Sequence, residues 1–254
     1  MANCAAMFAL AVSSQTWQTI SSLATAAGTL VLAIATFSAV RSAGRSARIA
    51  EIALQEQRRP LLTHSRTTDP EQKLMFAGGH WVRPAGGYAT AEHIDGIVYL
   101  SISLRNVGSG IAVCQAWTTF PTLALSGTNP DHTPTEDLRP QLRDLYIPPG
   151  DIGMWQGALR DADDPLRAAM AAAIDAREPV GVELLYSDQT GDQRTMTRFG
   201  LIPMEAESGK EVVWLTSMTR HWHLDRSDPR PDRSQAAAAA VANEPSEGGE
   251  PNTH

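Results

Sequence analysis

Residues 97–106 read IVYLSISLRN, and this stretch decides the fold class. Apolar side chains occupy every second position from Val98 to Leu104, and the positions between them are mainly polar. A period of two is typical of a β-strand with one buried face. The turn-forming residues NVGSG follow at 106–110, and IAVCQAW at 111–117 has the composition of a second strand. The chain is therefore expected to fold around paired β-strands.

Other short strands are predicted on both sides of this pair. The clearest hairpin joins residues 180–186 to residues 193–199 through the turn residues SDQTGD. Further strands are expected at 61–67, 74–77, 153–159 and 210–218. Residues 78–96 contain two Gly-Gly pairs and are expected to form a long loop, which is either a recognition surface or variable connecting chain. That loop would carry His80, Trp81, Arg83 and Tyr88.

One helix interrupts the strands. Asp164 can cap it, Pro165 fits its first turn, and the alanine-rich sequence continues to about Arg177. Parallel α/β folds need a helix after nearly every strand, and this pattern lacks them. Residues 60–225 are thus predicted to be mainly β, an immunoglobulin-like β-sandwich with one short helix. Residues 226–254 are rich in Pro, Ala, Ser and acidic residues, and we expect a disordered tail there.

The sequence ISSLATAAGTLVLAIATFSAV at residues 20–40 contains no charged side chain. A helix that rises about 1.5 Å per residue needs roughly 20 such residues to cross about 30 Å of hydrocarbon. Its serine and threonine hydroxyls can donate to carbonyls one turn earlier, which makes them tolerable in lipid. Trp17 precedes the run, at the place of an interfacial indole. These features predict a transmembrane helix at 20–40, after a short extracytoplasmic N-terminus at 1–19.

Two other interpretations of this run are weaker. A secretory signal peptide has a basic segment before a short apolar stretch, whereas no Lys or Arg precedes this long one. A buried core helix usually has an apolar stripe, whereas this run is apolar all round and is followed directly by Arg41, Arg45 and Arg48.

The arginines also predict the orientation. No Lys or Arg precedes the run, and five arginines follow it within residues 41–60. Because Lys and Arg near a span are retained on the cytoplasmic side, the N-terminus should lie outside and the later chain in the cytoplasm of a plasma (inner) membrane protein. The spacing of Arg41, Arg45 and Arg48 places them on one helix face, where they can meet anionic headgroups or act simply as stop-transfer charges.

No proline occurs between the run and Pro60, so one helix is expected to continue from about Ile20 to Gln57. Its juxtamembrane part, residues 41–59, has a modest apolar surface around Ile49 and Ile52 that could contact a partner helix or the domain. Small residues four apart, such as Ala24 and Gly28, permit close helix packing, so a homodimer is a weak hypothesis.

Charge and cysteine content limit the partners. The chain carries a net charge of -7, and residues 61–225 contain 13 basic and 21 acidic side chains. An acidic domain repels phosphate backbones, so nucleic acid is not an expected partner. The two cysteines, Cys4 and Cys114, cannot form a disulfide framework, and Cys114 lies in a predicted strand as a buried thiol. Such usage suits a reducing compartment.

Candidates for chemistry are sparse. His221 and His223 would share a strand face and form half of a metal site, but no third ligand is evident. Asp161, Asp163 and Asp164 lack the ligand spacing of a calcium loop, and helix capping explains them. The GSG at 108–110 is too short for a nucleophile elbow, and neither Gly-Gly pair is followed by the Lys-Ser or Lys-Thr of a phosphate loop. No catalytic residue, metal or cofactor is predicted.

The order of span, basic helix ending in QRRP at 57–60, and strand with LRNVGSGIA at 104–112 resembles uncharacterised membrane-anchored β-sandwich proteins of actinobacteria. The resemblance covers about residues 17–220 and implies the architecture only, because that family has no known catalytic residues.

The sequence favours a membrane-tethered, non-enzymatic binding or scaffolding protein, held in the lipid bilayer and contacting a protein partner through domain loops or the juxtamembrane helix. The alternative is a hydrolase or metal-dependent enzyme that uses Asp161, Asp163, His221 or His223, and it requires those side chains to converge. A sensor subunit of a transport or stress system differs from the first hypothesis only in its partner.

Overall fold

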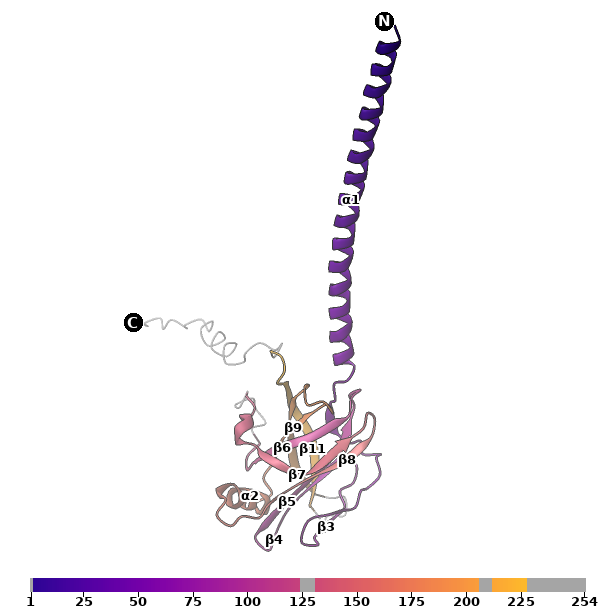
Figure 1. Cartoon of the computed structure of the whole chain (residues 1–254). Helices are drawn as coiled ribbons and strands as arrows, with labels where there is room; N and C mark the ends of the chain where they lie inside the picture. The colour runs from indigo at the N-terminus through magenta and orange to yellow at the C-terminus, as the bar shows by residue number, and fades with distance from the viewer. Residues whose placement is uncertain (1, 124–130, 206–211, 228–254) are drawn as a thin grey trace, which may run out of the picture. The chain divides into compact units, whose positions relative to one another are not determined.

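The computed structural model describes residues 2–123, 131–205 and 212–227, and side chains from residue 17 onward. The chain divides into two compact units, Met1–Glu56 and Gln57–His254. The first is one helix, α1 (Ala2–Glu56), shown in indigo to purple in Figure 1. A continuous helix through the juxtamembrane residues is thereby confirmed, and it begins before the expected Ile20. The predicted tail at 226–254 falls almost wholly outside the described residues.

The second unit is mainly β, as predicted. Its short helix is α2 (Pro165–Asp175), and a 3-10 turn, η1 (Thr135–Asp137), precedes β7. The strands are β1 (Leu62–His64), β2 (Leu74–Met75), β3 (Trp81–Val82), β4 (Tyr88–Ile94), β5 (Ile97–Asn106), β6 (Ala112–Phe120), β7 (Arg139–Ile147), β8 (Ile152–Leu159), β9 (Val180–Ser187), β10 (Thr195–Glu205) and β11 (Val212–His223).

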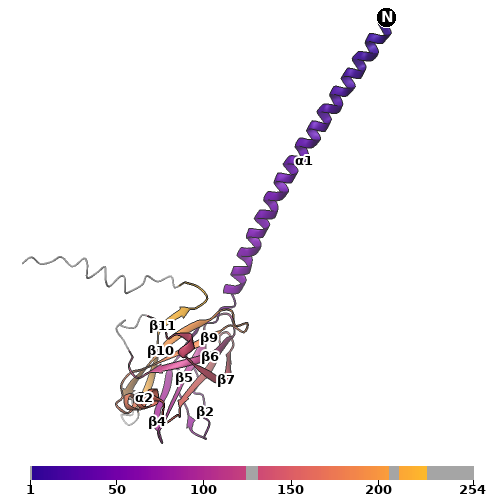
Figure 2. The ribbon, with the colours of Figure 1, turned by 60° about the vertical axis from the view of Figure 1, so that its left-hand side comes forward.

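Nine of these strands form one antiparallel sheet with the order β1-β5-β4-β11-β10-β9-β6-β7, and β8 also pairs with β5. β8 pairs along one side of β5, whereas β4 and then β1 pair along the other. The sheet curls until β7 and β8 meet: Trp155 Nε1 donates to Gln141 Oε1 at 3.1 Å. Both views show the strands crossing in two layers (Figure 1, Figure 2). The result is a β-sandwich-like domain.

The core lies inside this curled sheet. Val98, Leu100, Ile102 and Leu104 are fully buried, as the alternation in β5 predicts. The side chains between them are largely covered too, because the small β2–β3 sheet and neighbouring chain pack over the outer face at Tyr99. α2 adds Met170 and Ile174 to the core and lies beside β4 and β5 at one end of the sheet (Figure 2).

The prediction of a long loop at residues 78–96 is wrong. It contains β3 and the whole of β4, which is a central strand. β4 is hard to recognise because its buried side chains, Ala89 and Ala91, are small. β7 is likewise absent from the predicted strands, since Arg139, Pro140 and Asp144 give it the composition of an edge strand or loop.

Candidate functional site

α1 contains one segment long and apolar enough to cross a membrane. Within Trp17–Glu56, an 18-residue window has a mean hydropathy of 1.9, and none of that window is buried. Leu30, Val31 and Leu32 point in directions about 100° apart on a helix, and each is more than 60% exposed. Large apolar side chains therefore surround the helix on all sides. In water this surface is unfavourable, whereas in lipid it is the expected one.

The polar side chains of this segment are satisfied within the helix. Thr25 Oγ1 donates to Ser21 O at 2.8 Å, and Thr36 Oγ1 donates to Leu32 O at 2.7 Å. The hydroxyls of Ser21, Ser22, Thr29 and Ser38 also donate to carbonyls three or four residues earlier. The predicted back-bonding is confirmed, and it lowers the free energy needed to place hydroxyl groups in hydrocarbon.

The residues expected at the membrane interface flank this segment. Trp17 is 73% exposed, and Arg41, Arg45 and Arg48 are exposed on the continuous helix. Spacings of four and three residues place the three arginines on one face of α1. This arrangement can bind anionic headgroups through charge and through hydrogen bonds.

The NVGSG turn at 106–110 holds the chain that enters the domain from α1. The buried Asn106 amide is saturated: Oδ1 accepts from Leu61 N and Gly108 N, and Nδ2 donates to Gly110 O and Ile147 O, over 2.6–3.2 Å. Ser109 N donates to Arg59 O at 3.1 Å. A Cβ at Gly108 or Gly110 would overlap the backbone of residues 58–61. Close backbone approach therefore explains the glycines of this turn.

The same end of the domain carries a charged pair between its first and last described parts. Arg59 donates to both carboxylate oxygens of Asp225, at 3.0 and 2.7 Å, which keeps the pKa of Asp225 below its usual value. His223 is close to the same guanidinium, with 3.4 Å between Nδ1 and Arg59 Nη1. Burial, with repulsion from Arg59 and Arg226, lowers the pKa of His223 to about 4.

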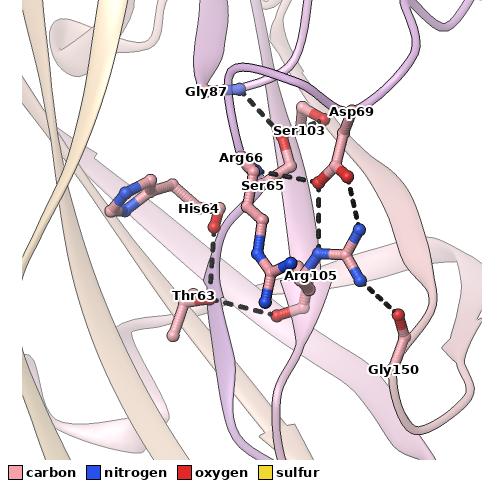
Figure 3. Close-up of polar contacts among 9 residues, drawn as sticks. All are labelled: Thr63, His64, Ser65, Arg66, Asp69, Gly87, Ser103, Arg105 and Gly150. Carbon is pink, nitrogen blue, oxygen red and sulfur yellow. Dashed lines mark hydrogen bonds and ion pairs between the residues drawn. The ribbon is translucent and has the colours of Figure 1, made fainter.

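A second polar network fixes the segment before β4. Arg105 of β5 donates from Nε to Asp69 Oδ2 at 3.1 Å and from Nη2 to Oδ1 at 2.5 Å, and its Nη1 donates to Gly150 O (Figure 3). The Arg105 hydrogen bond lowers the pKa of Asp69. Ser65 Oγ donates to Ser103 Oγ at 2.6 Å and accepts from Gly87 N at 2.9 Å. The Ser65 contact fixes Gly87, within the segment 84–88 that leads into β4.

This segment forms one wall of a groove of about 710 Å³, which we call the β4 groove. Its other walls are the end of α2 and the start of β11. The groove is lined by Arg83, Pro84, Ala85, Tyr88, Ala89, Thr90, Ala91, Glu92, Ile174, Asp175, Arg177, Val212, Val213 and Trp214. Arg83 and Tyr88 belong to residues 78–96, for which the sequence leaves a recognition surface and variable connecting chain as alternatives. The groove itself depends on how β4 and β11 diverge, which no local sequence signal shows.

The candidates for chemistry are not brought together. Leu159 at the end of β8 pairs with Val98, so Asp161 and Asp163 lie near the start of β5. His223 lies near Arg59, and β1 pairs with the far end of β5. At about 3.3 Å per residue, Val98 and Arg105 are about 23 Å apart. The acids and the histidines therefore occupy opposite ends of the sheet.

Several of the candidates have structural contacts instead. Asp164 caps α2 by accepting from Leu166 N at 3.0 Å and forms an ion pair with Arg139 at 2.7 Å. The rings of His221 and His223 lie close together, with their centroids 5.3 Å apart. Within residues 17–123, 131–205 and 212–227, no group of three His, Cys, Asp or Glu side chains could hold a metal ion.

Cys114 is buried in β6, as expected of a structural thiol, and burial raises its pKa to about 12. It is therefore a poor nucleophile at neutral pH.

Comparisons with known proteins give no family. The chain matches no protein-family model, and no curated protein and no solved structure is significantly similar to it.

Proposed function

We propose that this protein is a single-pass membrane-tethered binding module without enzymatic activity, whose β-domain lies in the cytoplasm. The observation that carries the proposal is the apolar segment of α1, which is exposed on every side and whose hydroxyls are internally hydrogen-bonded. A helix with such a surface is stable within a bilayer and would fix the protein there. The proposal includes the resemblance to actinobacterial membrane-anchored β-sandwich proteins, which rests on the sequence alone.

The distribution of arginine supports the orientation. Five arginines follow the span within residues 41–60 and none precedes it. The positive-inside rule then places Trp17 toward the outer side and the arginines toward the cytoplasm. The acidic domain would lie beyond them and present its surfaces to soluble partners rather than to nucleic acid.

Protease protection tests the orientation. Protease added to intact spheroplasts is expected to leave the domain uncut, and the same protease after lysis should degrade it. The matched variant replaces Arg41, Arg45 and Arg48 with glutamate, which should expose part of the population to external protease; a lysine triple variant should behave as the original. Cleavage of the unaltered domain in intact spheroplasts would reject the cytoplasmic location.

Crosslinking tests the binding role. Short-range crosslinking in native membranes, followed by purification of the full-length chain, should recover the same protein partner in independent preparations. Recovery of nothing but lipid and the chain itself at saturating crosslinker would contradict a binding function.

A further inference from the structure

The edge of β4 that faces β11 is only partly paired. The ladder between them consists of Ala89 opposite Trp214 and Tyr88 opposite Leu215. Thr216 N donates to Gly87 O at 3.1 Å just before it. β4 nevertheless continues to Ile94, and β11 continues its pairing with β10 as far as Val212 opposite Glu205. The two strands therefore diverge beyond Ala89, and the β4 groove lies where they separate.

The alternation of an antiparallel strand shows which backbone groups face this gap. Because the Gly87 carbonyl points toward β11, the N–H and C=O groups of Ala91 and His93 point to the same side. The opposite side of β4 is already paired with β5 from Ala89 to Ile94. In the register of Ala89 opposite Trp214, Ala91 would lie opposite Val212, and these two described residues are not paired. An open edge of this kind accepts another extended chain through main-chain hydrogen bonds.

The contacts that the charged side chains of the groove already make favour an acidic ligand. Its two acids already have partners: Glu92 Oε2 lies 2.7 Å from His80 Nε2, and Asp175 Oδ2 lies 2.9 Å from His93 Nδ1. Its two arginines, Arg83 and Arg177, are exposed and make no side-chain hydrogen bond or ion pair with any described residue. Arg177 is held in the left-handed conformation, with φ 56°, at the end of α2. Two guanidinium groups whose donors contact no described residue are suited to ligand carboxylates.

The middle of the groove is apolar. Ile174 and Trp214 are buried beneath it, and Pro84, Val212 and Val213 contribute to its walls. A side chain of moderate size on the ligand can displace water from this surface. Specificity in strand addition comes from such pockets for alternate side chains, whereas affinity comes from the main chain.

We propose that the β4 groove binds an extended acidic peptide segment of a partner protein, which pairs with the open edge of β4 and places carboxylates near Arg83 and Arg177. This inference rests on the proposed role as a binding module and names the chemistry of the partner. An apolar residue of the segment lies over Ile174 and Trp214.

The test uses the full-length chain in detergent micelles, where orientation has no effect, so that failure of the groove and failure of the tether are separate results. The probe is a fluorescein-labelled nonapeptide of alternating valine and threonine with two glutamates at each end. Fluorescence anisotropy should show saturable binding. A peptide with lysine in place of glutamate should bind at least about tenfold more weakly, since it reverses the charge opposite both arginines. Equal binding of the two peptides, or no binding at 1 mM, overturns the proposal.

Two variants locate the site. Arg83→Glu combined with Arg177→Glu should weaken binding of the acidic peptide about tenfold or more. Arg143→Glu combined with Arg160→Glu makes the same change in net charge at arginines outside the groove and should change it less than about twofold. Both double variants should first be shown to retain the thermal unfolding of the original domain. An equal loss of affinity in both overturns the assignment to the groove.

Hydrogen exchange tests the pairing itself. Saturating acidic peptide should slow exchange at the amides of Ala91 and His93, and should leave β7 amides unchanged. Binding without that protection contradicts strand addition. Protection that is already present without peptide, and that disappears on removal of residues 228–254, would identify the chain's own acidic tail as the occupant and reject a partner protein.

Discussion

The two units of this chain place similar side chains in opposite surroundings. Along β5, Val98, Leu100 and Ile102 are fully buried, whereas in α1 the equally apolar Leu30 and Phe37 are 63% and 70% exposed. Burial of a large aliphatic side chain contributes about 1.5–3 kcal/mol, and an exposed one contributes nothing in water. The domain thus has a core of its own, whereas the exposed apolar surface of α1 is compatible with a membrane anchor. Under the proposed function, the same hydrophobic effect folds the domain and places α1 in the bilayer.

The largest effect is expected from charges in the centre of α1. Leu30→Arg combined with Ile34→Arg should move most of the chain from the membrane fraction to the soluble or aggregated fraction. Each arginine costs about 2.5–3.5 kcal/mol at the centre of a span. The control is Leu142→Arg, because Leu142 is 99% exposed on the domain and meets water. Retention of the double variant in washed membranes would contradict the claim that the apolar surface of α1 anchors the chain in the bilayer.

A smaller loss of stability is expected from a cavity in the domain core. Ile102→Ala in β5 should lower the free energy of urea unfolding by about 2–5 kcal/mol, because the removed methyl groups are fully buried. Leu142→Ala should change it by less than about 0.5 kcal/mol. An equal effect of both substitutions would contradict the core as described.

A loss of stability is also expected from the NVGSG turn at 106–110, which contacts the backbone of residues 58–61. Gly110→Ala places a Cβ against the backbone of Arg58 and should destabilise the domain by about 1–3 kcal/mol. Gly44→Ala is the matched control, since Gly44 in α1 has no atom near the added Cβ. The domain's thermal midpoint should fall in the first variant and stay unchanged in the second. Unchanged midpoints in both variants would contradict the packing of residues 58–61 against Gly110.

The smallest effect concerns pH. Because the pKa of His223 falls from 6.5 to about 4 on folding, the unfolded chain binds more protons between these values. This group's contribution to stability should therefore decrease as the pH is lowered from about 6.5 toward 4. His223→Gln should remove that part of the dependence in urea titrations at several pH values. Asp69, whose pKa is lowered by Arg105, loses its contribution only below about pH 4, so the two are separable. A slope unaffected by His223→Gln would contradict the burial of this ring.

Sequence patterns reveal the parts of this molecule that depend on local periodicity. The uncharged run at 20–40, the alternation in β5 and the cap at Asp164 each identify their element directly. β4 is not predicted, because Ala89 and Ala91 give only a weak apolar alternation, although both lie in the core of the sheet. Short or weakly apolar strands are defined by their neighbours rather than by their own composition.

The candidate sites divide in the same way. The proposed interface residues, Trp17 and the arginines after the apolar run, are predicted from the linear sequence, because the two ends of a membrane span are neighbours of the apolar run along the chain. The β4 groove does not, since it arises where β11 stops pairing with β4 and α2 closes the gap. The role of the NVGSG turn also appears only in three dimensions, where Gly110 meets the backbone of Arg58.

Membrane partition of the unaltered protein tests the central claim most directly. Cells that express the full-length chain are lysed, and the membranes are washed with alkaline carbonate before ultracentrifugation. The account predicts that the chain stays in the pellet and enters the supernatant only when detergent is added, while a chain of residues 57–254 stays soluble throughout. Full-length protein in the carbonate supernatant without detergent would contradict it.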